Sequence, residues 1–142
     1  MANILILGAG SIGTAFSFPC SDKNNSVTII GTHLENNFID QINSKRIHPA
    51  LKCNVPKNVQ FLKFNELSKT INKKVDLIAI AVSSKGIEWA STELSKVLKI
   101  NVPILILTKG LAINNNNYEV LAHKMERLFN KNGIKQTNIS AV

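Results

Sequence analysis

The sequence predicts a doubly wound α/β fold, in which a parallel β-sheet is covered by helices on both faces. Continuous apolar runs alternate along the chain with stretches in which apolar residues recur at helical spacing. The first run, which ends at Gly8, is uninterrupted, as in strands that are buried on both faces. Each connection is long enough to hold a helix, and parallel neighbours need such a crossover. The 142 residues suit one ordinary domain, so we expect a single domain over residues 1–142.

The first strand is expected at residues 3–7, where an apolar run ends at Gly8. A second apolar run at residues 26–30 is closed by Gly31, and the roughly 18 residues between the runs fit one helix and a turn. That helix contains Pro19, whose ring should cost about 3 kcal/mol unless the helix ends before it. The pattern then repeats. The further expected strands are residues 58–62, 76–82, 103–108 and 137–142, and the further expected helices are residues 35–45, 65–70, 85–98 and 118–129.

The composition argues against several classes of protein. Seventeen Lys and Arg against nine Asp and Glu give a net charge of +8, which suits an anionic partner, but no run of basic residues exceeds two, so we do not expect nucleic-acid binding. The apolar runs are far shorter than the roughly 20 residues that cross a bilayer, and no basic segment precedes the first one, so we expect a cytoplasmic protein without a membrane span. The cysteines and histidines are scattered and lack the spacing of a disulfide framework or metal site; they are Cys20, Cys53, His33, His48 and His123.

A nucleotide-binding fingerprint follows the first strand. Gly8, Gly10 and Gly13 form the pattern G-x-G-x-x-G between a strand and a helix of one βαβ unit. Gly8 permits a tight turn, Gly10 leaves room for a pyrophosphate, and Gly13 lets the helix lie close to the strand. The amides of Ser11 and Ile12 at the helix start then point toward the phosphates.

The residues at the end of the second strand determine how the site binds the adenosine ribose. A simple NAD-binding site would have an Asp or Glu there, whereas this chain has Thr32 and His33. The missing carboxylate permits a 2′-phosphate, and His33 could donate to that phosphate or stack on adenine. Glu35 follows two residues later and could still reach a ribose, so the choice between NAD and NADP stays open.

Together, the motifs resemble those of one family, the bacterial-type NAD(P)-dependent glycerol-3-phosphate dehydrogenases. The glycine fingerprint alone is common to many dehydrogenases, but a strand that ends in Thr108-Lys109-Gly110 about a hundred residues later is more specific. The resemblance covers essentially the whole chain. The matching stretches are residues 8–15, residues 27–31, His48-Pro49 with residues 56–59, residues 81–84 and residues 108–111.

The resemblance implies a Rossmann-type domain that binds NADPH or NADH, with dihydroxyacetone phosphate or glycerol 3-phosphate as the substrate. It also allows a homodimer. In the family, the residues that match Ser11 and Ile12 bind the pyrophosphate through the backbone, and those that match Thr32 and His33 meet the adenosine. The residue that matches Lys109 contacts both the nicotinamide cofactor and the glycerol phosphate. Such a contact suits a lysine held at the end of a buried strand, since its cation can pair with a phosphate or polarise a ketone.

The sequence also departs from the family. The family usually has an aromatic residue in place of Ile12, an Arg or His in place of Thr32 and a Pro in place of Ser83, and its loop corresponding to residues 46–55 is longer. It continues past the position of Val142 into a helical substrate domain that carries the general acid/base lysine. We therefore expect residues 1–142 to be the cofactor domain alone, truncated before the substrate domain, with no catalytic residue of its own and negligible turnover.

Other functions stay open at this point. One alternative is a stand-alone nucleotide-binding module without catalysis. Another is a different reductase with the same first domain, such as a ketopantoate reductase, although Thr108-Lys109-Gly110 argues against it. Nucleic-acid binding is the remaining, weaker alternative.

Overall fold

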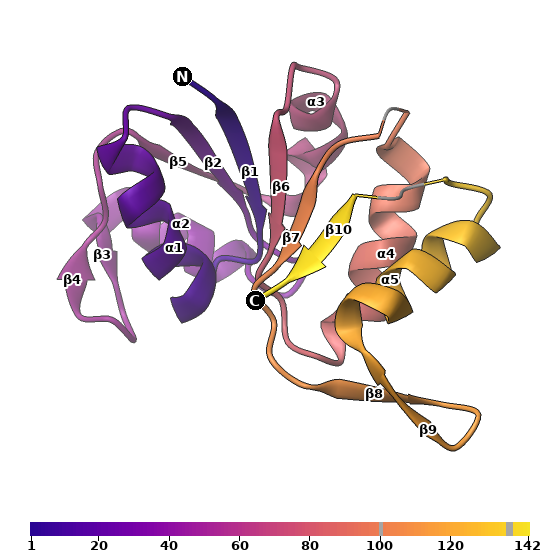
Figure 1. The fold of residues 1–142 in the computed structure, drawn as a ribbon. Helices are drawn as coiled ribbons and strands as arrows, with labels where there is room; N and C mark the ends of the chain where they lie inside the picture. Colours follow the sequence, from indigo (N-terminus) through magenta and orange to yellow (C-terminus); the bar gives the residue numbers. More distant parts are fainter. Residues whose placement is uncertain (100, 136–137) are drawn as a thin grey trace.

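Figure 1 shows the computed structural model, which describes residues 1–99, 101–135 and 138–142. Six strands form one sheet in the order β10-β7-β6-β1-β2-β5, and every neighbouring pair is parallel. The doubly wound α/β prediction is therefore confirmed. The strands of this sheet are β1 (Asn3–Leu7), β2 (Ser26–Ile30), β5 (Val59–Leu62), β6 (Leu77–Ile80), β7 (Ile104–Ile106) and β10 (Ile139–Ala141).

The helices divide the interior into two cores, one on each face of the sheet (Figure 1). The helices are α1 (Ser11–Asp22), α2 (Asn36–Lys45), α3 (Leu67–Ile71), which follows the 3₁₀ turn η1 (Phe64–Glu66), α4 (Gly86–Val97) and α5 (Leu121–Lys131). Within β1, Leu5 and Leu7 face the core formed with α4 and α5, whereas Ile4 and Ile6 face the core formed with α2. Alternate residues of β1 thus enter opposite cores, which is why residues 4–7 contain no polar position.

The strand order reverses between β1 and β6. From β1 the chain adds β2 and β5 on one side, then crosses back to place β6 against the other edge of β1, followed by β7 and β10. Ligands of such sheets bind beyond the carboxyl ends of the strands at this reversal. In this chain, the loops after β1, β2, β6 and β7 occupy that end.

Two short hairpins were not predicted from the sequence. The first pairs β3 (Ile47–His48) with β4 (Cys53–Asn54), and the second pairs β8 (Leu111–Asn114) with β9 (Asn117–Val120). The second hairpin corrects the expected helix at residues 118–129, because residues 118–120 belong to β9 and the helix begins at Leu121. Asn115 and Asn116 make the turn with φ values of 48° and 62°, a left-handed conformation that asparagine tolerates well.

The remaining boundary differences are small. The expected strands at residues 76–82 and 103–108 are shorter in the structure, since pairing stops where the chain turns into the loops at the carboxyl edge. The last strand, expected from residue 137, is described from Ile139, and Thr137 lies outside the described residues. Among the described residues, no helix is both long and apolar enough to span a membrane.

Helix α1 continues through Pro19 to Asp22 rather than ending early. A proline there has no N–H to donate to the carbonyl of Ala15, so one bond of the helix is missing. The buried face of α1 consists of Gly13, Thr14, Ser17 and Ser21, small residues that let the helix lie close to the sheet. The helix is thus kept by its close packing despite the interruption.

Replacing Pro19 with alanine should stabilise the protein. Pro19 is exposed, so its ring contributes little burial, while Pro19→Ala restores an N–H inside an intact helix. We expect the free energy of unfolding in urea to rise by about 1–3 kcal/mol. Pro49→Ala, in an exposed turn outside the helices, is the matched control and should give no such gain. A decrease in stability for Pro19→Ala would contradict a helix that continues past this position.

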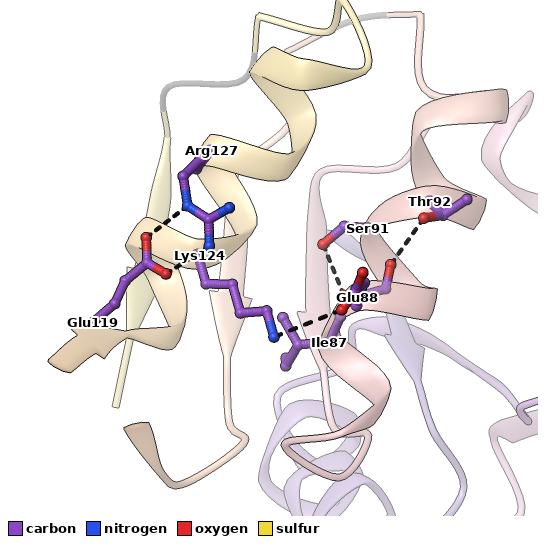
Figure 2. A network of polar contacts seen from close by, with 7 residues as sticks. All are labelled: Ile87, Glu88, Ser91, Thr92, Glu119, Lys124 and Arg127. Carbon is purple, nitrogen blue, oxygen red and sulfur yellow. Dashed lines mark hydrogen bonds and ion pairs between the residues drawn. The ribbon is translucent and has the colours of Figure 1, made fainter. Parts of the chain in front are cut away.

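The β8–β9 hairpin projects from the body of the domain and is tied back by an ion pair (Figures 1 and 2). Arg127 on α5 donates from Nε and Nη2 to the two carboxylate oxygens of Glu119, at 3.0 and 2.8 Å. Lys124 lies 3.9 Å from Glu88 and links α5 to α4 in the same network. The Arg127 guanidinium lowers the pKa of the Glu119 carboxyl below its usual value.

The order of this hairpin should depend on pH. Because the pKa of Glu119 is lower in the folded protein than in the unfolded chain, its contribution is complete above the unfolded value and is lost as the pH falls through the folded one. Hydrogen–deuterium exchange at residues 111–120, corrected for intrinsic rates, should accelerate below about pH 4. In the Glu119→Gln variant, the same amides should already exchange fast at neutral pH, and their exchange should show no further acid dependence. Equal acid profiles for the two proteins would refute the role of this pair.

Candidate functional site

The structure brings together the loops that the sequence marked as a site. The amide of Gly8 donates to the carbonyl of Ile30 at 2.8 Å, which joins the glycine turn to the end of β2. The Thr108 hydroxyl donates to the carbonyl of Val82 at 2.6 Å, which joins the end of β7 to the end of β6. The four loops therefore form one continuous edge at the strand reversal.

The glycine turn packs so closely against the neighbouring backbone that neither Gly8 nor Gly13 could carry a side chain. Gly8 has a φ of +111°, and a Cβ there would lie 2.7 Å from the carbonyl oxygen of Ala81. A Cβ on Gly13 would lie 2.2 Å from the carbonyl oxygen of Gly8 and 3.0 Å from the Cβ of Ala81. Gly10 differs, since a Cβ there would meet no atom within 4 Å. The open space at Gly10 is a cradle that a ligand can approach.

The amino terminus of α1 opens onto this space. Gly10 is its N-cap, no side chain caps the helix, and no acidic residue lies in its first turn. The amides of Ser11, Ile12 and Gly13 precede the first intrahelical bond, which Thr14 donates to the Gly10 carbonyl at 3.0 Å. Ser11 and Ile12 are exposed. These amides and the positive end of the helix suit an anionic group such as a pyrophosphate.

The peptide groups of Ala9, between the first two glycines, are held from both sides. Its amide donates to Glu35 Oε2 at 3.2 Å. Its carbonyl accepts from the Thr14 hydroxyl at 3.1 Å and lies 3.3 Å from Nε2 of His48. Because Leu51 donates its amide to Nδ1 of His48, Nε2 carries the proton and is the donor. His48 is buried, and it is a structural support for the turn rather than a ligand-facing group.

A pocket of about 270 Å³ lies beyond the ends of β2 and β6. The His33 and Trp89 rings pack with their centroids 4.9 Å apart, and Trp89 also packs on Phe64 at 5.0 Å. This aromatic wall suits a planar, apolar group such as a nucleobase. The lining residues are Thr32, His33, Leu34, Val82, Ser83, Lys85, Gly86 and Trp89.

Lys109 lies at the other end of the site, in the loop after β7. Thr108 is buried and fixes the backbone just before it, whereas the Lys109 side chain is exposed. Gly110 follows with a φ of +130°, a conformation that lets the chain leave the strand end abruptly. Strands β6 and β1 separate Lys109 from Thr32 and His33, so the predicted residues form two ends with the glycine turn between them.

Sequence reasoning missed part of this arrangement. The sequence contains no spacing that marks His48 as a support of the turn, and none that indicates a role for Trp89. The distance between Glu35 and Ala9 in the chain hid their hydrogen bond, although an acidic residue about 20 positions after the glycines is a usable signal. Among the described residues, no group of three or more His, Cys, Asp or Glu could hold a metal ion.

A parallel sheet with a glycine turn at its reversal point, an uncapped helix start and a flanking pocket define a Rossmann-type domain with the dehydrogenase fingerprint. More particularly, the chain belongs to the family described as NAD-dependent glycerol-3-phosphate dehydrogenase N-terminus, whose model matches residues 3–139. This membership confirms the resemblance seen in the sequence.

Individual relatives agree with this family. An NADP(+)-dependent glycerol-3-phosphate dehydrogenase of Archaeoglobus fulgidus is 28% identical over 125 residues, covering 88% of this chain and 36% of that protein. A glycerol-3-phosphate dehydrogenase [NAD(P)+] of Lactococcus lactis is 32% identical over 108 residues, covering 76% and 31%. The structure of a glycerol-3-phosphate dehydrogenase from Coxiella burnetii superposes with a TM-score of 0.76 at 22% identity, covering 90% and 38%, and shows the same fold. The chain thus spans about a third of the length of these relatives.

Alanine at Gly13 should disrupt the turn. Its Cβ would overlap the Gly8 carbonyl oxygen, so α1 must move away from the sheet, and we expect a loss of about 3 kcal/mol in the free energy of unfolding. Gly10→Ala is the matched control in the same motif. It has room and an ordinary φ of −66°, so its stability should stay within about 1 kcal/mol of the wild type. Equal losses in urea unfolding for the two variants would contradict this account of the packing.

Proposed function

We propose that this chain is the cofactor-binding part of an oxidoreductase that interconverts dihydroxyacetone phosphate and sn-glycerol 3-phosphate with NADH or NADPH. The observation that carries the proposal is the family match over residues 3–139, combined with an open cradle at Gly10. We also propose that the protein is cytoplasmic. A homodimer would be tested by measuring the molecular mass of the protein in solution.

The residues present fit a dinucleotide cofactor. The amides of Ser11 and Ile12 would hold the pyrophosphate, with Gly10 leaving the room that it needs. Thr32 and His33 would meet the adenosine, whose base suits the pocket beside Trp89. The nicotinamide end would then extend across β1 and β6 toward Lys109.

The division of chemical roles follows from these positions. When bound, a nicotinamide cofactor would supply or accept the hydride of the reaction. Lys109 is exposed and follows the buried Thr108, so its cation is available to pair with the substrate phosphate or to polarise the ketone. Lys109 is a binding residue in this proposal. The group that moves the proton is expected outside residues 1–142, in the helical substrate domain that the family resemblance implies.

The proposal is tested first by cofactor binding and then by turnover. Trp89 is the only tryptophan of the chain and lines the pocket, so bound NADH should quench its fluorescence through energy transfer to the nicotinamide. The 142-residue chain should bind NADH without oxidising it when dihydroxyacetone phosphate is added. Absence of binding would refute the assignment as a cofactor domain, and turnover would refute the placement of the proton-transfer group outside it.

Gly10→Ala should separate cofactor binding from folding. The structure leaves space for the new methyl group, but that space is where we place the pyrophosphate, so affinity for NADH should fall by at least about tenfold. The measurement is the same fluorescence titration, with the unfolding curve of the variant as the control for the fold. Unchanged affinity would show that no pyrophosphate approaches the backbone at Gly10.

A further inference from the structure

Glu35 holds its carboxylate between the two loops that flank the adenosine end of the site. It immediately precedes α2, and its Oε2 accepts hydrogen bonds from the amides of Thr32, at 2.7 Å, and Ala9, at 3.2 Å. The backbone of Glu35 is fixed as well, because its own amide donates to the Thr32 carbonyl at 3.0 Å and its carbonyl accepts from Ile39 at 2.8 Å. The carboxylate therefore has one defined place, beside the glycine turn.

That place corresponds to the ribose position of dinucleotide-binding folds. In such folds a carboxylate about 20 residues after the glycines, near the end of the second strand, accepts hydrogen bonds from the ribose hydroxyls. The end of β2 itself supplies no acid, since Gly31 and Thr32 stand there. Glu35 stands 22 residues after Gly13 and folds back to the middle of the Gly8–Gly10 turn. It thus delivers a carboxylate to the same location from the helix rather than from the strand.

The charge at this place is not cancelled by a neighbouring cation. Within the described residues, no ion pair joins Glu35 to a Lys or Arg, and its two partners are neutral amides, which use only Oε2. Lys85 is the single Lys or Arg among the residues that line the pocket, and it comes from the opposite side, at the start of α4. The His33 ring packs on Trp89, and in the part of the chain that the structure describes no ion pair joins His33 to Glu35.

We propose that Glu35 makes this site select NADH over NADPH. This inference rests on the proposed function and specifies its cofactor. Oε1 of Glu35 is available to accept hydrogen bonds from the ribose hydroxyls of NADH. The 2′-phosphate of NADPH replaces one of these hydroxyl donors with an anion, so the same carboxylate loses a hydrogen bond and repels the ligand. Glu35 is a specificity-determining residue because it discriminates between two ligands that differ only there.

The test compares the affinities of the two cofactors in the wild type and in Glu35→Gln. The amide oxygen of glutamine still accepts from Thr32 and Ala9, so the loops keep their geometry while the charge is lost. By Trp89 fluorescence titration, the wild-type chain should bind NADH at least about tenfold more tightly than NADPH, and Glu35→Gln should reduce this ratio to about threefold or less, mainly by gaining affinity for NADPH. Lys85→Gln is the matched control, because it removes a positive charge from the pocket instead of a negative one. This variant should maintain or increase the preference for NADH.

A second measurement needs no variant. If the preference is electrostatic, the wild-type ratio should fall as the salt concentration rises from about 0.05 to 0.5 M, because ions screen the repulsion between Glu35 and the 2′-phosphate. A wild type that prefers NADPH, or an unchanged ratio in folded Glu35→Gln, would overturn the inference. Glu35→Ala weakening both cofactors equally, with Glu35→Gln like the wild type, would show that Glu35 only positions the loops. Failure of the wild type to bind either cofactor would refute the proposed function itself.

Discussion

The contact between the first turn of α1 and the glycine turn is the constraint on which the site depends. The Cα of Gly13 lies against the carbonyl oxygen of Gly8, and Gly8 in turn lies against the backbone of Ala81. Only residues without a Cβ allow this approach, so α1 starts directly above the point where the strand order reverses. The exposed amides at the helix start and the cradle at Gly10 are consequences of this packing. A helix that started farther from the sheet would present neither to a common ligand.

The turn is supported by residues that come from later parts of the chain. Glu35, just before α2, binds the amide of Ala9, and His48, from the β3–β4 hairpin, binds its carbonyl. The packing of His48 edge-on against Phe38, with ring centroids 5.1 Å apart, ties this support to α2. The conformation of the turn is therefore fixed during folding, and a ligand need not order it on binding. This is also the reason why a hairpin of two-residue strands matters to the site.

The sequence predicted the parts of the structure that depend on local patterns. Apolar-rich stretches identified all six strands of the main sheet, although β2 and β5 contain the polar residues Thr28 and Gln60, and the glycine spacing located the turn. The hairpins escaped prediction because two-residue strands such as Ile47–His48 have no period, and because Tyr118–Val120 continues into a helix without a break in the sequence. The hydrogen bonds of Glu35 and His48 to the glycine turn escaped for another reason. Each joins a side chain to a backbone group of Ala9, 26 and 39 positions away, and the sequence indicates only that Glu35 follows the glycines at a suitable distance.

The two ends of the site differ in how firmly they are built. At the β2 end, Glu35 is hydrogen-bonded to two loops and the His33 and Trp89 rings pack on each other, so the groups that would meet adenosine are already in place. At the β7 end, Thr108 fixes the backbone, but the Lys109 side chain is exposed. Under the proposed function, the preorganised groups at the β2 end would contribute binding energy for the adenosine end of the cofactor. The exposed Lys109 would gain a fixed position only on contact with a ligand, so the proposal places cofactor binding before the engagement of a substrate phosphate by Lys109.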